Sequence, residues 1–464
     1  MEHTERMGDK MSFPENFLWA TTTTSYQHEG AAFDDGKGLS IWDVFCQRPG
    51  TIYKNHNGNV ACDFYHRYKD DIALMKQIGV KGCRLSICWP RVLPEGVGAV
   101  NPKGIEFYDS LIDELLAAGI EPWVTLFHWE YPYDLYCRGG WHNPDSSDWF
   151  AEYTQVVVDR LSDRVSNWLT INEFVGFIEC GHRQGVQAPG EKLSTPELLR
   201  VAHNAMLAHG KSVQVIRAHS KQNCNIGFAK AGLPYLPATD DPRDIEAART
   251  KTFAMTEKNL WCNSWWTDPI FLGKYPEDGL ALFGSDMIEY SDDDMKIISQ
   301  PIDFCGTNFY CGEGFVRAGK DDAVEILPEP ECGMDMTPFG TPLTPTSLYW
   351  GPRFLYERYK KPIVITENGM SSCEWVSLDG KVHDPMRIDY LHRYLLELER
   401  AVEDGIDIRG YFLWSIMDNF EWSCGYRPRY GIIHVDYPTQ KRILKDSAYW
   451  YKNVIATNGA SIKS

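Results

Sequence analysis

The stretch "KPIVITENG", residues Lys361 to Gly369, carries four apolar or β-branched residues directly into Glu367, which an asparagine and a glycine follow. A short apolar run bounded by a turn signal is typical of a buried strand. The strand predicted here therefore ends in a carboxylate. The rest of the chain has to explain why a buried strand should end in that way.

Eight such runs recur along the chain, separated by amphipathic stretches, which is the pattern of repeated βα units. Two of the intervening segments, "IEFYDSLIDELLAAG" and "MRIDYLHRYLLELERAVEDG", show helical periodicity. The pattern predicts an α/β fold, a single (β/α)8 TIM barrel with extended βα loops. A doubly wound open sheet is the alternative, but the GxGxxG turn that often accompanies it is missing. The runs are "FLWATTTTSY", "KGCRLSICW", "EPWVTLFHW", "NWLTINE", "CNIGFAKAG", "DFCGTNFY", "KPIVITE" and "GYFLWSIMDN".

A length of 464 residues fits either three domains or one barrel with long loops. We predict one barrel domain over residues 13–455, with a flexible N-terminal tail at 1–12 and a C-terminal tail at 456–464. Two stretches interrupt the βα rhythm. Leu233 to Gln300 contains helix-like pieces of its own, and Gly319 to Trp350 is expected to form an ordered loop over the barrel mouth.

The composition narrows the possible partners and the compartment. A formal charge of −18 without any Lys/Arg run disfavours nucleic acid and anionic membranes. Thirteen cysteines without a CxxC pair argue against a disulfide framework and a closed zinc site. The charged N-terminal stretch lacks the apolar core of a signal peptide, so we expect a cytoplasmic protein, although secretion by another route stays open.

The predicted strands end in polar and aromatic residues, and in a βα barrel all of these ends meet on one face. Each residue has an ordinary interpretation: a strand-end glutamate as a hydrogen-bond acceptor in a loop, a tryptophan as barrel filling, a histidine as a satisfied core residue. Together they are harder to explain in that way. The strand-end residues are Gln27, His28, Glu29, Arg84, Trp89, His128, Trp129, Asn172, Glu173, Asn308, Tyr310, Glu367, Asn368, Trp414 and Asp418 to Trp422.

Glu173 and Glu367 end the fourth and seventh predicted strands and would face one cavity. Hydrolysis of a glycosidic bond needs such a pair, one carboxylate attacking the anomeric carbon and the other protonating the leaving oxygen, about 5 to 5.5 Å apart in a retaining enzyme. Two like charges at that spacing should split into one low and one raised pKa. Arg84 and Tyr310 are the candidates to keep one carboxylate ionised.

The segments "TINE" (170–173), "ITENG" (365–369) and "DNFEW" (418–422) resemble the signatures of glycoside hydrolase family 1, the β-glucosidase family, as do "FPENFLWATTTTSYQHEGA" and "RLSICWPRVLPEG". The resemblance covers Phe13 to Asn453. It implies a (β/α)8 barrel and a retaining double displacement on small-molecule β-glucosides or oligosaccharides. It also implies that neither a metal nor an organic cofactor takes part.

The resemblance assigns the site residue by residue. Glu173 matches the acid/base, Glu367 the nucleophile, and Arg84 and Tyr310 the groups that orient the nucleophile; we group Asn308 with these catalytic residues. A cis peptide is implied between Trp414 and Ser415. The implied substrate-binding residues are Gln27, His128, Trp129, Asn172, Trp414, Glu421 and Trp422.

Some positions bear on specificity. Relatives that act on 6-phosphorylated sugars carry Ser and Lys where this chain has Glu421 and Pro428, so unphosphorylated sugars are favoured; Tyr430 and nearby Arg427 or Arg429 keep the phosphorylated alternative open. Phe174 replaces a usual proline, and Leu348 lies near the position of a tryptophan that stacks on the leaving group, with Trp350 two residues on.

Three other properties stay open at this point. The first is the balance between hydrolysis and transglycosylation. The second is the preference among gluco, galacto and fuco sugars, although we expect activity on all three. The third is the oligomeric state. A non-catalytic sugar-binding barrel is the remaining rival, and the presence of both Glu173 and Glu367 disfavours it.

Overall fold

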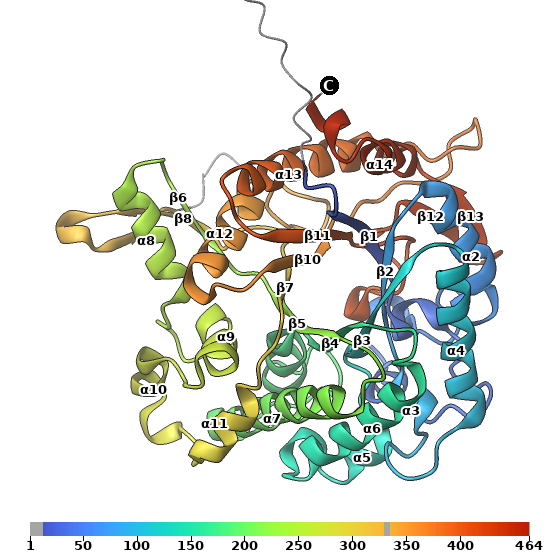
Figure 1. The fold of residues 1–464 in the computed structure, drawn as a ribbon, viewed down its shortest axis with the longest axis horizontal. Coiled ribbons are helices and arrows are strands. Elements are labelled where there is room, and N and C mark those ends of the chain that lie inside the picture. Colours follow the sequence, from blue (N-terminus) through green and yellow to red (C-terminus); the bar gives the residue numbers. More distant parts are fainter. Residues whose placement is uncertain (1–12, 329–334, 464) are drawn as a thin grey trace, which may run out of the picture.

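The computed structural model describes residues 13–328 and 335–463. Eight parallel strands close into a barrel in the order β1-β11-β10-β7-β5-β4-β3-β2 (Figure 1). Each predicted apolar run supplies one strand, so the TIM-barrel prediction is confirmed and the open sheet is wrong. The strands are β1 (Leu18–Thr22), β2 (Gly82–Ser86), β3 (Glu121–Phe127), β4 (Asn167–Asn172), β5 (Asn225–Ala231), β7 (Cys305–Asn308), β10 (Ile363–Asn368) and β11 (Ile408–Leu413).

The inside of the barrel is filled by side chains. The ring of Trp123 on β3 lies 5.4 Å from that of Phe304, next to β7, and 5.1 Å from that of Phe412 on β11. Neither β7 nor β11 neighbours β3, so these contacts cross the interior. The barrel is therefore a packed core, and only its ends are free to hold chemistry.

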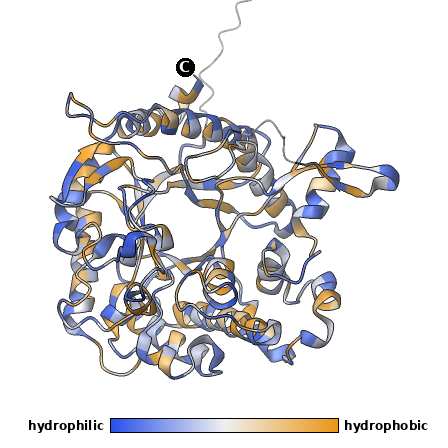
Figure 2. Ribbon diagram, turned by 180° about the vertical axis from the view of Figure 1, so that it is seen from behind, coloured by the Kyte–Doolittle hydropathy of each residue, from blue (hydrophilic) through white to orange (hydrophobic). Residues whose placement is uncertain are grey.

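Helices surround the strands, and their blue and orange segments alternate in Figure 2, as expected of amphipathic helices packed on a barrel. The two helices predicted from periodicity are α4 and α13. The helices are α1 (Ile41–Phe45), α2 (Phe64–Ile78), α3 (Trp89–Val92), α4 (Pro102–Ala117), α5 (Tyr133–Cys137), α6 (Ser146–Leu161), α7 (Thr195–His219), α8 (Pro242–Phe253), α9 (Asn263–Leu272), α10 (Glu277–Phe283), α11 (Asp292–Ile298), α12 (Ser347–Tyr359), α13 (Pro385–Glu403) and α14 (Asp446–Ala456). In the described ranges no helix has the length and apolarity needed to cross a membrane.

The two interrupting stretches have different structures. The stretch 233–300 carries α8 to α11, which agrees with its helix-like sequence. The stretch 319–350 is more regular than a loop, because it includes β9 (Val324–Ile326), which pairs with β8 (Gly314–Ala318), and it ends in the first turn of α12. β6 (Tyr235–Pro237) joins β8 in a small separate sheet.

The chain ends also differ from one another. The predicted N-terminal tail, 1–12, lies outside the described residues. At the other end, Ala460–Lys463 forms a short helical turn, Ile462 is buried, and the Ile462 carbonyl lies 2.6 Å from His392 Nε2. The described part of the predicted C-terminal tail is therefore packed against α13.

Candidate active site

Glu173 and Glu367 lie at the carboxyl ends of β4 and β10, with β5 and β7 between them in the barrel. Asn308, the last residue of β7, donates a hydrogen bond to Glu173 Oε1 (2.9 Å) and another to Asn172 Oδ1 (3.1 Å). Its side-chain oxygen, Oδ1, accepts from Thr366 Oγ1 (2.6 Å), which fixes the orientation of the amide. The barrel thus brings the two strand-end glutamates to the same network.

Glu367 is held by two strong donors. Arg84 Nη1 lies 2.6 Å from its Oε1, and the Tyr310 hydroxyl donates to its Oε2 at 2.7 Å. The other Arg84 amino group donates to Asn172 Oδ1 (2.6 Å), and Arg84 Nε donates to Thr125 Oγ1 (3.0 Å). Because a guanidinium and a hydroxyl both favour the charged form, Glu367 is the carboxylate of the pair that this geometry stabilises as an anion.

Glu173 has a different environment. It is half-buried, and its only side-chain donor among the described residues is the Asn308 amide. Burial, followed by the charge of Glu367, raises the pKa of Glu173 to about 7. Burial also raises the pKa of Glu367, while Arg84 and Tyr310 oppose that rise. The expected split into one low and one raised pKa is therefore wrong, because desolvation raises both.

Polar residues extend the network from the glutamates. Gln27 Nε2 donates to Glu421 Oε2 (3.2 Å), to Asn419 Oδ1 (3.0 Å) and to the carbonyl of Phe420 (3.0 Å). Burial, followed by the charges of Glu367 and Glu173, raises the pKa of Glu421 to about 8. Glu421 therefore lies within the electrostatic field of the pair, although it comes from another strand end.

Aromatic rings form one wall of the site. The ring of Trp422 lies 4.7 Å from that of Trp129 and is stacked at 5.9 Å on His128, which is itself stacked at 6.3 Å on Trp414. His128 Nε2 contacts the Asn172 amide (3.3 Å), and burial holds the pKa of His128 well below its usual value. The imidazole is therefore neutral, with its Nδ1 unpartnered among the described residues.

The structure brings all the predicted site residues into one connected set. The contacts above link Arg84, His128, Trp129, Asn172, Glu173, Asn308, Tyr310, Glu367, Trp414 and Trp422, and the pair of Gln27 and Glu421 joins them through the charges of Glu367 and Glu173, which act on Glu421. The peptide between Trp414 and Ser415 is cis, as the resemblance implies.

The residues that depart from the family pattern have structural roles. Phe174 is buried and stacks on Trp266, with ring centroids 5.3 Å apart and planes at 7°. Leu348 and Trp350 are buried in α12, and Arg353 lies over the Trp350 ring. Neither α12 residue offers an open face to a ligand.

Lys230 and Glu130 are two buried titratable side chains near the site that the sequence reasoning missed. Lys230, on β5, is buried and donates to the Ala231 carbonyl (2.6 Å) and to Asn263 Oδ1, and burial lowers its pKa to about 8. Its charge acts on Glu173 and lowers the pKa of that carboxyl. The sequence feature that could have revealed Lys230 is the presence of a lysine inside the apolar run that forms β5.

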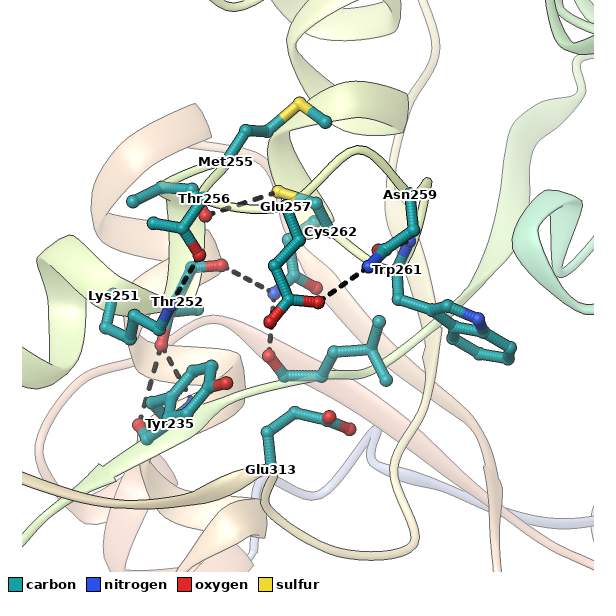
Figure 3. A pocket seen from close by; sticks show the side chains of 13 residues that line it. Tyr235, Lys251, Thr252, Met255, Thr256, Glu257, Asn259, Trp261, Cys262 and Glu313 are labelled. Atoms are coloured by element: carbon teal, nitrogen blue, oxygen red, sulfur yellow. Dashed lines mark hydrogen bonds between the residues drawn. The ribbon is translucent and has the colours of Figure 1, made fainter. Parts of the chain in front are cut away.

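A hollow of about 130 Å³ lies beside the end of β5 (Figure 3). Glu257 and Asn259 form one edge, where the Asn259 amide donates to the Glu257 carboxylate (2.9 Å), and Glu313 lies opposite them. None of the predicted site residues lines this hollow. It is joined to them through Asn263, which lines it and holds Lys230.

Known proteins resemble this chain over nearly its whole length. Residues 9–460 match the family described as Glycosyl hydrolase family 1. Beta-glucosidase A of Acetivibrio thermocellus is 44 % identical over 460 residues, covering 97 % of this chain and 99 % of that one. Beta-glucosidase A of Thermotoga maritima is 43 % identical, covering 96 % and 98 %. A structure of the family 1 β-glucosidase from Thermotoga maritima in complex with isofagomine lactam matches with a TM-score of 0.87 at 42 % identity, covering 96 % and 99 %.

Proposed function

The chain belongs to glycosyl hydrolase family 1 and is a glycoside hydrolase, and we propose that it removes terminal, non-reducing β-D-glucosyl residues by a retaining double displacement. We assign the catalytic roles from the hydrogen-bond donors around the two glutamates, which differ. Glu367 is bonded to Arg84 and Tyr310, whereas Glu173 is bonded to one neutral amide. Glu367 is thus the nucleophile and Glu173 the acid/base.

In the first step the Glu367 carboxylate forms a bond to the anomeric carbon while the bond from that carbon to the leaving oxygen breaks. The proton on Glu173 moves to the leaving oxygen. With a pKa of about 7, Glu173 carries this proton over the acidic side of neutrality. Asn172, held by Arg84 and His128, presents its amide at the sugar.

In the second step water attacks the anomeric carbon and the ester to Glu367 breaks. Glu173 now has to accept a proton, so its pKa should fall. The structure supplies a cause, because the charge of Glu367 is one of the two main factors that raise the pKa of Glu173. Formation of the ester removes that charge and makes Glu173 a better base at the moment when one is required.

The sugar that fits is a neutral one. Glu421 and Gln27 place an acceptor and an amide together, and the aromatic wall of Trp414, Trp422 and Trp129 suits the C–H face of a pyranose. Arg429, which could have favoured a 6-phosphate, donates to Asp418 (2.5 Å) and to the Val435 carbonyl (3.0 Å). These bonds support unphosphorylated glucosides as the substrates.

The roles are tested with two variants. Glu367→Ala should lose nearly all turnover, and azide should restore it with an α-glycosyl azide as product, because the small anion replaces the missing nucleophile on its own face of the sugar. A β-azide would mean that the roles are reversed. Glu173→Ala should keep cleavage of substrates with acidic leaving groups, which need little protonation, and should lose cleavage of alkyl glucosides. An equal loss on both classes contradicts the assignment.

We infer activity on β-galactosides and β-fucosides as well, since Glu421 and Gln27 can accept and donate in more than one arrangement. An activity panel of aryl β-glycosides, beside their 6-phosphates, measures this directly. Comparing glucose release with aglycone release at rising acceptor concentration separates hydrolysis from transglycosylation.

A further inference from the structure

Glu130 follows Trp129 after the end of β3, and the residue is 2 % exposed. The Ser25 hydroxyl donates to its Oε2, and its Oε1 has no partner among the described residues. Asp43 on α1 is in the same situation: it is 3 % exposed, and its Oδ1 is unpartnered. Both residues line one cavity of about 10 Å³, which is close to the space that a single water occupies.

The bond from Ser25 to Glu130 connects two segments of the proposed glucose pocket. Ser25 begins η1 (Ser25–Glu29), the single π-helical turn that carries Gln27, and its backbone N–H donates to Ser86 Oγ on β2 (2.8 Å). Glu130 is covalently next to Trp129. The contact therefore fixes the turn that carries Gln27 relative to Trp129 of the aromatic wall.

The charges around Glu130 are already paired with one another. Arg91 Nε bonds to Glu29 Oε2 (2.9 Å), and Lys37 Nζ bonds to Asp43 Oδ2 (2.7 Å). The remaining titratable groups that face Glu130 are Cys88, Tyr108 and Tyr153. Neither cation of this described cluster forms an ion pair with Glu130; the charge of Lys37 lowers the pKa of Glu130, but burial, followed by the charge of Glu29, raises it to about 8.

We propose that Glu130 is a positioning residue for the glucose pocket and that it acts as a neutral carboxylic acid, bridged to Asp43 by one water in the cavity. The inference rests on the proposed function. The acid proton on Oε1 donates to the water, and the water donates to Asp43 Oδ1, so that both orphaned oxygens are satisfied. Ionisation of Glu130 adds a third negative charge to the cavity that Glu29 and Asp43 also line and displaces η1 together with Gln27.

Glu130→Gln tests this, because an amide keeps the shape and the donor but cannot ionise. KM for p-nitrophenyl β-glucoside is measured for both proteins from pH 6 to 9.5, with the inhibition constant of glucose as a measure of binding alone. Glu421 titrates in both proteins and changes both KM values in the same way, so the ratio of the wild-type KM to the variant KM is free of its effect. The ratio should rise about tenfold between pH 7 and pH 9, because the competent fraction of the wild type falls to about one tenth. A ratio that does not change with pH overturns the proposal.

A second pair of measurements distinguishes positioning from a purely structural role. The raised pKa of Glu130 costs the wild type stability between the unfolded value of 4.5 and about 8. The Tm of Glu130→Gln minus the Tm of the wild type should therefore increase as pH rises from 5 to 8. A Tm difference that does not change with pH contradicts a neutral Glu130. Ser25→Ala removes the connecting bond without altering charge. It should raise KM at every pH while kcat changes less, and an unchanged KM contradicts the connection to Gln27.

Discussion

Replacing Glu367 by glutamine should lower the pKa of Glu173, and this fall is the physical basis of the acid-to-base exchange. The pKa of Glu173 is raised from 4.5 to about 7, with burial as the larger cause and the charge of Glu367 as the second. The variant removes the second cause and leaves the first. It also releases Arg84 from its carboxylate partner, which adds to the fall.

The expected fall is about one to two units, the range for a like charge at the spacing of a retaining pair. At about 1.4 kcal/mol for each unit, it represents about 1.4 to 3 kcal/mol of interaction between the two carboxyls. Burial remains, so the pKa of Glu173 in the variant should stay above 4.5. These limits leave a window that a titration can resolve.

The measurement is a ¹³C NMR titration of protein labelled at the glutamate carboxyl carbon, with Glu173→Gln used to identify the signal. Glu421→Gln is the matched control, because Glu421, with a pKa of about 8, is still protonated where Glu173 titrates and so carries no charge that could shift it. The same Glu367→Gln variant should also lower the pKa of Glu421 from about 8. If Glu173 still titrates near 7 without the charge of Glu367, burial alone sets its pKa and the exchange of roles has no basis in this geometry.

Three further outcomes follow from contacts in the site. Arg84→Lys removes the forked guanidinium group that bonds Glu367, Asn172 and Thr125 at the same time. Since each lost hydrogen bond to a charged group costs about 1.5 kcal/mol, kcat/KM should fall by more than tenfold. A fall of less than threefold would contradict this. Glu421→Ser should raise KM for p-nitrophenyl β-glucoside at least tenfold, since it removes a half-buried acceptor next to Gln27; an unchanged KM would count against the sugar assignment. Lys230→Met removes a buried cation whose pKa is near 8 instead of 10.5. Because the charged lysine destabilises the folded wild type, the free energy of unfolding of the variant minus that of the wild type should be about 3 kcal/mol larger below pH 8 than above pH 10.5. Denaturant titrations at both pH values test this, and a pH-independent difference refutes it.

The barrel was predictable because its signal is repeated. Each buried strand gives a short apolar run, and the eight runs needed only the rule that parallel strands are joined by helices. The same rule placed Glu173 and Glu367 on one face, although they lie far apart in the chain. Strand limits were less certain: β11 begins at Ile408, two residues before the predicted run, because Ile408 pairs with Ile363 on β10.

What the sequence could not give is the set of partners that fixes each charge. Nothing in the amino-acid sequence distinguishes Glu130 from other glutamates, because only the fold brings Ser25 and Asp43 close to it. One carboxyl of the pair was expected to have a low pKa, because Arg84 and Tyr310 would keep it ionised. The structure makes Glu367 that carboxyl, and the prediction failed because burial raises the pKa of Glu367. The depth of burial depends on the packing of every neighbouring loop and has no local signature in the sequence.

The distribution of charge in the pocket argues for a neutral sugar more strongly than any single contact does. Glu173, Glu367 and Glu421 face a common space, and Arg84 is the cation that bonds to one of them. With Glu173 near 7 and Glu421 near 8, both of these carboxyls are protonated on the acidic side of neutrality, and Glu367 is the carboxylate that Arg84 and Tyr310 stabilise as an anion. A 6-phosphate would bring nearly two further negative charges next to Glu421 in a water-poor site, whereas a hydroxyl can donate to Glu421 or accept from it. Equal kcat/KM for an aryl β-glucoside and its 6-phosphate would therefore refute this assignment of protons as well as the choice of substrate.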